Sequence, residues 1–284
     1  MKLLVGSVYA SGEPQQLEWL GLQKQFLNKT TEDYDLCAYV SHPDISEFKD
    51  VNVIANRADD PRETHCSILH VEGLRCLRDY FVTQKDNYDA FLFLDSDAFP
   101  VKQDWLPTLV TRMGQQTHKK DCAAIVRAEL CEMRYHASVL FCLPAALDGL
   151  QFLFGQVTNG GVEGQDLLGN YENDIHISYQ RSPDRCRVFP LLRTNRYNIH
   201  PVACGIYYDM FYHHAFGSEH GVKKNTEPFQ SLRNAGKYGY GIDWSGGSYD
   251  FRDLYNRIMD TPSEFVRRLG GWSDNYAWVR HRKG

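Results

Sequence analysis

The chain has 284 residues, of which 43% are hydrophobic and 24% charged, the balance of a globular protein that can bury a substantial core. Its formal net charge of -5 and pI near 6.1 argue against a general nucleic-acid-binding protein. Phosphate contacts need clustered Lys and Arg, and here the basic residues are mostly interleaved with acidic ones. We therefore expect no nucleic-acid partner.

Cysteine usage and the absence of long apolar runs indicate the cellular compartment of the protein. Eight cysteines are spread along the chain without any CxxC pair, several of them inside apolar runs such as HASVLFCL, which favours reduced, buried thiols. The N-terminal run MKLLVGSVYASG is too short for a signal peptide, and no stretch approaches the roughly 18 apolar residues of a membrane helix. We expect a soluble, cytoplasmic protein without a transmembrane segment.

The N-terminal segments predict strands that alternate with helices. Residues 2–9 and 35–41 are β-type runs on either side of residues 17–30, whose leucines follow helical spacing. A further short strand is predicted at residues 51–54. The order strand, helix, strand is typical of layered α/β folds.

The next helix leads into an unusual strand. Residues 65–82 place apolar side chains three or four apart along one helical face, and an apolar strand follows at 89–94. Strands separated by helices imply parallel pairing with right-handed crossovers, so we predict an α/β fold with a mostly parallel central sheet and helices on both faces. In such folds, ligands bind at the carboxyl ends of the strands.

The second half of the chain is less regular. Residues 122–127 and 137–143 predict strands, residues 144–157 predict a helix, and after Gly155 the sequence is rich in Gly, Asn and Asp. No internal repeat and no low-complexity linker is evident. We therefore expect one domain over residues 1–284, with a loop-rich C-terminal part.

The segment FLFLDSDAF places two carboxylates, Asp95 and Asp97, one residue apart at the end of an apolar strand. Side chains at positions i and i+2 of an extended segment point the same way, so both can face one hard cation through oxygen. Mn²⁺ or Mg²⁺ is the expected ion. The alternative is that Asp95 merely caps the following turn. Buried carboxylates without a partner are costly, which favours the metal site.

With the strand that leads into it, FLFLDSDAF resembles the DxD motif of GT-A glycosyltransferases, which hold a nucleotide-diphosphate sugar through a divalent cation. Two later segments resemble motifs of the glycogenin-like enzymes among them, in the same order. YHASVLFC resembles their FNSG strand, with His136 in place of Asn. EGQDLLGNY resembles their DQDxLN segment, with Gln165 and Asp166 matching and Gly164 in place of the first Asp.

A third segment, YHHAFGSEHG, resembles the HFxGxxKPW segment of the same enzymes. The resemblance puts His214 at the metal-ligand position, Gly217 at the glycine and His220 in place of the lysine. A histidine from a distant loop would complete the coordination that two aspartates leave open, and the cation would act as a Lewis acid on the diphosphate. The preceding His213 is expected to point elsewhere if the segment is extended.

The resemblance implies a GT-A, Rossmann-like fold. Residues 1–100 would be the nucleotide-binding half, 101–245 the donor-sugar and acceptor half, and 246–284 a C-terminal helical tail. The expected donor is a nucleotide sugar, with UDP as the expected nucleotide. The acceptor hydroxyl can belong to a glycan, a lipid, a protein or a small molecule.

Donor contacts are expected at three places: the carboxyl end of the first strand, the helix before the acidic strand, and the acidic motif itself. These residues are Ser7, Val8, Tyr9, Arg75, Arg78 and Ser96. Tyr9 can stack on uracil, or alternatively pack as a surface tyrosine. Arginines at exposed helix positions are also often merely solvated.

Two signals compete for the catalytic group. Gln165 and Asp166 match the segment that lies under the donor sugar in retaining enzymes. Glu172 and Asp174, in YENDIHIS, instead resemble the helix start from which inverting enzymes take the general base that deprotonates the acceptor. Acidic residues at a helix start can also simply favour the helix dipole. We favour a retaining enzyme.

Three other classes compete with the glycosyltransferase. A haloacid-dehalogenase-like phosphohydrolase also carries DxD, but its motif usually lies near the N-terminus, and Phe99 stands where Thr or Val is common. A nucleotidylyltransferase would need a basic, Gly-rich loop after the first strand, which SVYASGEPQQ lacks. A non-catalytic module that binds nucleotide sugars or glycans is the third alternative.

Overall fold

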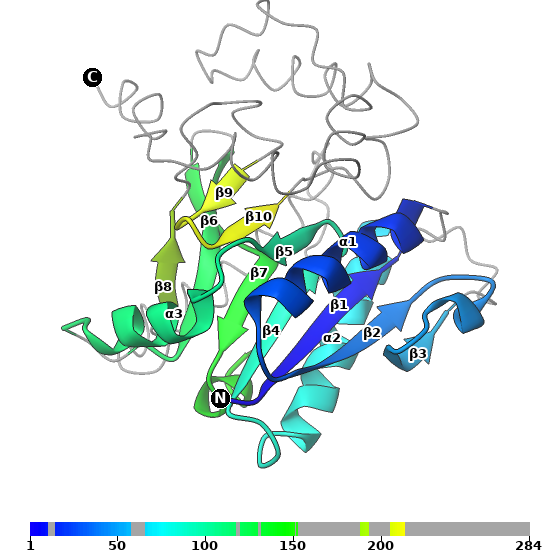
Figure 1. Ribbon diagram of the computed structural model, residues 1–284, viewed down its shortest axis with the longest axis horizontal. Helices are drawn as coiled ribbons and strands as arrows, with labels where there is room; N and C mark the ends of the chain where they lie inside the picture. Colours follow the sequence, from blue (N-terminus) through cyan, green and yellow to red (C-terminus); the bar gives the residue numbers. More distant parts are fainter. Residues whose placement is uncertain are drawn as a thin grey trace, which may run out of the picture.

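The computed structural model describes residues 1–10, 15–57, 66–117, 120–129, 132–150, 152, 188–192 and 205–213. Within these residues the centre of the molecule is a seven-stranded sheet (Figure 1). Its strands are, in spatial order, β3 (Asn52–Asn56), β2 (Tyr34–Val40), β1 (Leu3–Tyr9), β4 (Ala90–Asp95), β7 (Glu132–Cys142), β6 (Cys122–Glu129) and β8 (Val188–Leu191).

A second, smaller sheet lies beside the end of β4. It contains β5 (Ala98–Pro100), β10 (Phe211–His213) and β9 (Gly205–Tyr207), in that order. The described helices are α1 (Gln15–Thr30), α2 (Cys66–Thr83), α3 (Trp105–Gly114) and the single turn α4 (Pro144–Leu147), together with a 3-10 turn at Ile45–Glu47.

The predicted α/β fold with a mostly parallel sheet is confirmed. Strand β1 runs parallel to both β2 and β4, β2 runs parallel to β3, and β6 runs parallel to β8. Strand β7 is antiparallel to its neighbours β4 and β6. Four of the six neighbouring pairs are therefore parallel. The N-terminal half follows the strand, helix, strand order that its periodicity indicates.

Helices cover both faces of this sheet. Because side chains alternate along a strand, Leu3 and Val5 of β1 join the core cluster under α1 and α3, whereas Leu4 and Val8 join the cluster under α2. Figure 1 shows α1 and α2 on opposite sides of the strands. The strands β1 and β4 are thus buried on both faces, which explains their continuous apolar sequence.

Helix α2 lies unusually close to β1. A Cβ atom at Gly6 would lie 2.7 Å from Cδ2 of Leu77, and one at Gly73 would lie 2.7 Å from Cγ1 of Val8. A side chain at either position would force the neighbouring side chains to shift. The close packing fixes α2 against the sheet, and its residue His70 contacts Asp95.

The helix predicted at residues 144–157 is wrong in its length. The structure ends this helix at Leu147, and a turn follows in which the N–H of Gly149 donates to the carbonyl of Ala146. Leu150 and Phe152 are buried beyond this turn, and their apolar character, typical of a helix face, reflects packing in the cluster under α2. The remainder of the predicted helix, at residues 151 and 153–157, lies outside the described residues.

Other features of the sequence are covered only in part. Cys37, Cys122 and Cys142 are buried and Cys76 is half-buried, as expected for thiols in apolar runs. No helix among the described residues is long and apolar enough to cross a membrane. The division into segments 1–100, 101–245 and 246–284 stays a prediction, and the last segment lies outside the described residues.

Candidate metal centre

The acidic motif forms the turn between the two sheets. Residues Ala90 to Leu94 are fully buried, and Asp95 is the last residue of β4. Ser96 and Asp97 form the turn, and β5 begins at Ala98. The side chains of Asp95 and Asp97 are only 15% and 4% exposed. The apolar strand therefore carries two carboxylates to a site from which water is largely excluded.

A buried amide on α1 holds this turn in place. Gln23 donates from Nε2 to the carbonyl oxygens of Asp95, at 3.0 Å, and of Ala98, at 2.8 Å. Its Oε1 accepts a hydrogen bond of 2.8 Å from the hydroxyl of Tyr9, which fixes the orientation of the amide. A fully buried Gln whose donors and acceptor are all used restricts its surroundings. The turn is thus fixed to β1 and α1.

Strand pairing brings a histidine to the turn from more than a hundred residues away. Strand β10 is antiparallel to β5, with His213 directly opposite Ala98. On its other side β10 pairs with β9, and the connection contains Tyr208 and Asp209 in the left-handed region, at φ 54 and 56. Two consecutive left-handed residues are typical of tight hairpins, although non-glycine residues rarely adopt them.

An aromatic contact anchors this hairpin to the main core. Phe211 of β10 is fully buried and packs edge-on against Trp105 of α3, with ring centroids 4.8 Å apart. Burial of such a side chain contributes about 1.5–3 kcal/mol. The position of His213 therefore depends on a short strand pairing and on this contact.

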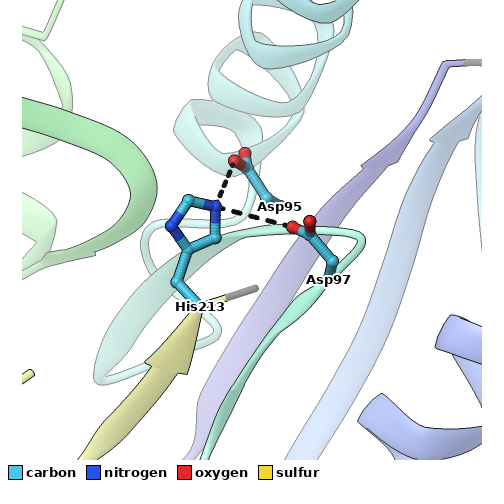
Figure 2. Close-up of side chains that lie close together, drawn as sticks. All are labelled: Asp95, Asp97 and His213. Atoms are coloured by element: carbon cyan, nitrogen blue, oxygen red, sulfur yellow. Dashed lines mark ion pairs between the residues drawn. The ribbon is translucent and has the colours of Figure 1, made fainter. Parts of the chain in front are cut away.

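Asp95, Asp97 and His213 form one compact group. Nε2 of His213 lies 3.4 Å from Oδ2 of Asp95 and 3.5 Å from Oδ1 of Asp97. Figure 2 shows the three side chains turned toward one another. One ligand atom from each residue lies within 4.8 Å of the other two, so the group could hold a metal ion.

A second histidine fixes the orientation of Asp95. Nε2 of His70, on α2, lies 2.9 Å from Oδ1 of Asp95, on the opposite oxygen from the one that faces His213. Burial by itself would raise the pKa of the Asp95 carboxyl, but His70 and His213 together outweigh burial and hold that pKa well below its usual range. Asp95 is therefore an anion at neutral pH, ready to serve as a ligand.

The donor atoms suit a divalent cation. Two buried carboxylates side by side repel each other, and their negative charge needs compensation. Carboxylate oxygens suit Mg²⁺ and Mn²⁺, and an imidazole nitrogen shifts the preference toward transition metals. The residues present fit such an ion through one oxygen from each aspartate and Nε2 of His213.

The prediction that His213 points away from the acidic pair is wrong. The segment is extended, as assumed, and its pairing with β5 turns His213 toward the acidic pair. His214 lies outside the described residues, so its role as a ligand stays a prediction. Five further predicted residues, Gln165, Asp166, Asp174, Gly217 and His220, also lie outside the described residues.

The predicted donor contacts on β1 are inside the protein. The Ser7 hydroxyl donates to the carbonyl of Leu94 at 3.0 Å, and Val8 packs under α2. Tyr9 is fully buried, with its ring edge-on to Phe48 rather than on the surface. Burial raises the pKa of the Tyr9 hydroxyl far above its usual value. Contact of these residues with a nucleotide stays a prediction.

The two predicted arginines contact main-chain carbonyl groups. Nε of Arg75 donates to Phe152 and Nη1 of Arg78 donates to Leu150, so both tie α2 to the segment after α4. Ser96 is buried in the turn between the aspartates. Whether these three side chains also reach a donor stays a prediction.

Sequence reasoning missed three residues that the structure brings to the site. They are Gln23 on α1, His70 on α2 and Ser138 on β7. Each lies on an element that the sequence does predict. Gln23 and His70 lie in no motif, and Ser138 lies in the segment YHASVLFC without being marked there as a site residue, because the partners of all three are set by the packing of α1, α2 and β7 and not by local spacing.

Solved structures to which this chain is similar include several transferases. No protein-family model and no curated protein sequence matches the chain. A glycosyltransferase involved in the glycosylation of the major capsid of PBCV-1 is 12% identical, with a TM-score of 0.39 over 67% of this chain and 82% of that chain. A Drosophila beta-1,4-galactosyltransferase 7 in complex with manganese, UDP-Gal and xylobiose is 13% identical, with a TM-score of 0.36 over 67% of this chain and 65% of that chain.

A cytidylyltransferase from Leptospira borgpetersenii gives a similar result. It is 12% identical, with a TM-score of 0.40 over 96% of this chain and 98% of that chain. Identities this low and TM-scores below 0.5 carry no argument about activity.

Proposed function

We propose that the protein is a metal-dependent glycosyltransferase that moves a sugar from a nucleotide-diphosphate sugar, with UDP as the expected nucleotide, to an acceptor hydroxyl. One observation carries the proposal: Asp95 and Asp97, at the carboxyl end of a central parallel strand, converge with a histidine from a distant strand. The carboxyl ends of such strands are where ligands bind in open α/β sheets.

Each of the three side chains would supply one ligand atom to a cation. Asp95 presents Oδ2 while His70 occupies its Oδ1, Asp97 presents Oδ1, and His213 presents Nε2. The burial of all three keeps competing water away and strengthens their electrostatic action. A divalent cation bound here would supply Lewis-acid stabilisation of the charge that develops on a leaving diphosphate.

The remaining roles are proposed from the sequence motifs. Gln165 and Asp166 are proposed to lie under the donor sugar of a retaining enzyme, with Asp174 as the alternative general base of an inverting one. Ser7, Val8 and Tyr9 are proposed to lie near the nucleotide, Arg75, Arg78 and Ser96 to contact its phosphate or ribose, and Gly217 and His220 to contact the diphosphate.

The direct test is turnover of nucleotide sugars. We expect slow release of free UDP from at least one UDP-sugar in the presence of Mn²⁺, loss of this activity with EDTA, and recovery when Mn²⁺ is added back. The Asp97→Asn variant should be inactive under all three conditions. The proposal is overturned if turnover is unaltered by EDTA, or if no nucleotide sugar binds or reacts with Mn²⁺ present.

The products of the same assay separate the competing classes. Release of inorganic phosphate from simple phosphate esters would indicate a phosphohydrolase. Formation of pyrophosphate from a nucleoside triphosphate would indicate a nucleotidylyltransferase. Binding of a nucleotide sugar without turnover would indicate a non-catalytic module.

A further inference from the structure

A chain of hydrogen bonds extends from the metal centre into β7. Ser138 is fully buried on this strand, and its hydroxyl oxygen lies 3.4 Å from Nδ1 of His213. The same oxygen lies 2.5 Å from Nδ1 of His136. His213 faces the aspartates with Nε2, so Ser138 contacts the ring nitrogen that the metal centre does not use.

The sheet register explains why Ser138 is at this position. The ladder between β4 and β7 ends with Leu94 opposite Val139, so the next residue of β4 is Asp95 and the next of β7 is Ser138. On the other side of β7 the pairing with β6 shifts between Ala124 and Ile125. Irregularities of this kind often re-aim side chains next to functional sites.

One backbone donor fixes the direction of the whole chain of hydrogen bonds. The N–H of Ser138 donates to Nδ1 of His136 at 3.0 Å. A ring nitrogen that accepts such a bond carries a lone pair and no hydrogen. With no hydrogen on Nδ1, the contact with the Ser138 hydroxyl is a bond that the hydroxyl donates, and it shares the one lone pair of Nδ1 with the backbone N–H.

The direction at His213 follows from this. With its hydrogen directed to His136, Oγ of Ser138 offers only lone pairs to His213, and the contact of 3.4 Å is a bond donated by Nδ1–H of His213. A neutral imidazole with its hydrogen on Nδ1 carries a lone pair on Nε2. When a cation lies among the three atoms, that lone pair faces it; when none is bound, a hydrogen on Nε2 faces the carboxylate oxygens of Asp95 and Asp97 instead.

We propose that Ser138 is a positioning residue, which fixes His213 in the tautomer whose Nε2 can bind a divalent cation, and that His136 orients the Ser138 hydroxyl for this purpose. The inference rests on the cation site of the proposed function. It goes beyond that function by naming the residues that set the tautomer of His213. Hydrogen-bond partners of this kind fix the tautomer and ring orientation of metal ligands, and their loss typically costs 10- to 100-fold in metal affinity.

The first test measures the affinity for Mn²⁺ of the parent protein and of three variants. Ser138→Ala removes the hydroxyl and should weaken Mn²⁺ binding by about 10-fold or more. Ser138→Thr keeps the hydroxyl and should restore most of the affinity. The matched control is Thr30→Val on α1, which removes a buried hydroxyl whose partners are the carbonyl of Phe26 and the hydroxyl of Thr31, and it should leave Mn²⁺ affinity unchanged.

A second measurement needs no variant. In the Zn²⁺-loaded parent protein, nitrogen NMR of the imidazole rings should show hydrogen on Nδ1 of His213 and metal on Nε2. Zn²⁺ is chosen because it accepts histidine nitrogen as a ligand and has no redox chemistry. Hydrogen on Nε2 of His213 in the loaded protein would overturn the assignment, whether or not the Ser138 variants fold.

The outcomes separate this inference from the function on which it rests. If the parent protein binds neither Mn²⁺ nor Zn²⁺, both proposals are wrong. If the parent binds Mn²⁺ and Ser138→Ala binds it equally well, only the role of Ser138 is wrong. If Ser138→Thr is as weak as Ser138→Ala, the effect reflects packing and the hydroxyl has no special role.

Discussion

The seven-stranded sheet and the three-stranded sheet support the metal centre in different ways. Strand β4 lies between β1 and β7 with apolar clusters on both faces, so the position of Asp95 follows from a strand that is packed on every side. Strand β10 has three residues and is held by equally short neighbours and by Phe211. The comparison indicates that the positions of Asp95 and Asp97 are firmly fixed and that the position of His213 is the one that can adjust.

The largest effect is expected at the firmly placed part. Asp97→Asn replaces an anionic ligand by a neutral amide, and we expect Mn²⁺ affinity to fall by more than about 100-fold, because even outer-shell changes cost 10- to 100-fold. Asp86→Asn, an exposed carboxylate elsewhere in the chain, is the matched control. Calorimetric titration measures both variants. Equal affinities in Asp97→Asn and the parent would remove the acidic motif from the site.

The next effect distinguishes the two adjacent histidines. His213→Ala should weaken Mn²⁺ binding by about 10-fold or more, since the structure places its Nε2 against both aspartates. The resemblance to glycogenin-like enzymes assigns the same role to His214. Parallel titrations of His213→Ala and His214→Ala decide between them. A loss in His214→Ala with none in His213→Ala would mean that the pairing of β5 with β10 is shifted by one residue.

A smaller effect tests whether the three-stranded sheet holds the metal centre less firmly than the seven-stranded sheet does. Phe211→Leu loosens the small sheet and Phe81→Leu loosens α2 on the large sheet, and both side chains are fully buried. Each change should cost on the order of 1 kcal/mol or more in unfolding free energy, because buried volume is lost. Only Phe211→Leu should also weaken Mn²⁺ binding, by several-fold. Equal Mn²⁺ affinities in the two variants would show that β10 is not the adjustable part.

The smallest effect is expected far from the site, at Asp35. Its carboxylate accepts a hydrogen bond of 2.6 Å from Tyr88 and lies 3.3 Å from Nζ of Lys2. The Tyr88 hydrogen bond, with help from Lys2, outweighs desolvation and lowers the pKa of this exposed carboxyl. Asp35→Asn should cost at most about 1 kcal/mol, because exposed pairs contribute little.

The pH dependence of this effect has a definite sign. A carboxyl with a lowered pKa in the folded protein stabilises it at pH values above the unfolded pKa, and the contribution is lost as pH falls through the folded pKa. The stability difference between the parent and Asp35→Asn should therefore vanish in strong acid. Unfolding curves at several pH values measure it, and a difference that grows toward low pH would contradict the assigned direction.

The sequence predicts the large sheet well because its signals are local. The helical spacing of Val71, Leu74 and Leu77 and the apolar run before Asp95 follow directly from burial on one face or on two. Such patterns can be recognised without knowing which elements pack against the helix or the strand. The acidic motif could be placed for the same reason, as the end of a strand whose type was already clear.

The histidine could not be placed in the same way. Alternation along a strand assigns adjacent residues to opposite faces, but it does not say which face meets the site until the partner is known. The partner is Ala98, and the register depends on a hairpin whose left-handed residues are Tyr208 and Asp209, not the glycine or asparagine that would signal it. His70 lies on a predicted helix, and its partner is likewise a matter of tertiary packing.

The central claim is that Asp95, Asp97 and His213 together bind one divalent cation. Pulsed electron paramagnetic resonance of Mn²⁺ bound to the protein tests this most directly, because it detects nitrogen in the first coordination sphere. We predict one Mn²⁺ per chain, with a nitrogen coupling that disappears in His213→Ala and remains in His70→Ala. Absence of nitrogen coupling in the parent protein, or its persistence in His213→Ala, would contradict the account.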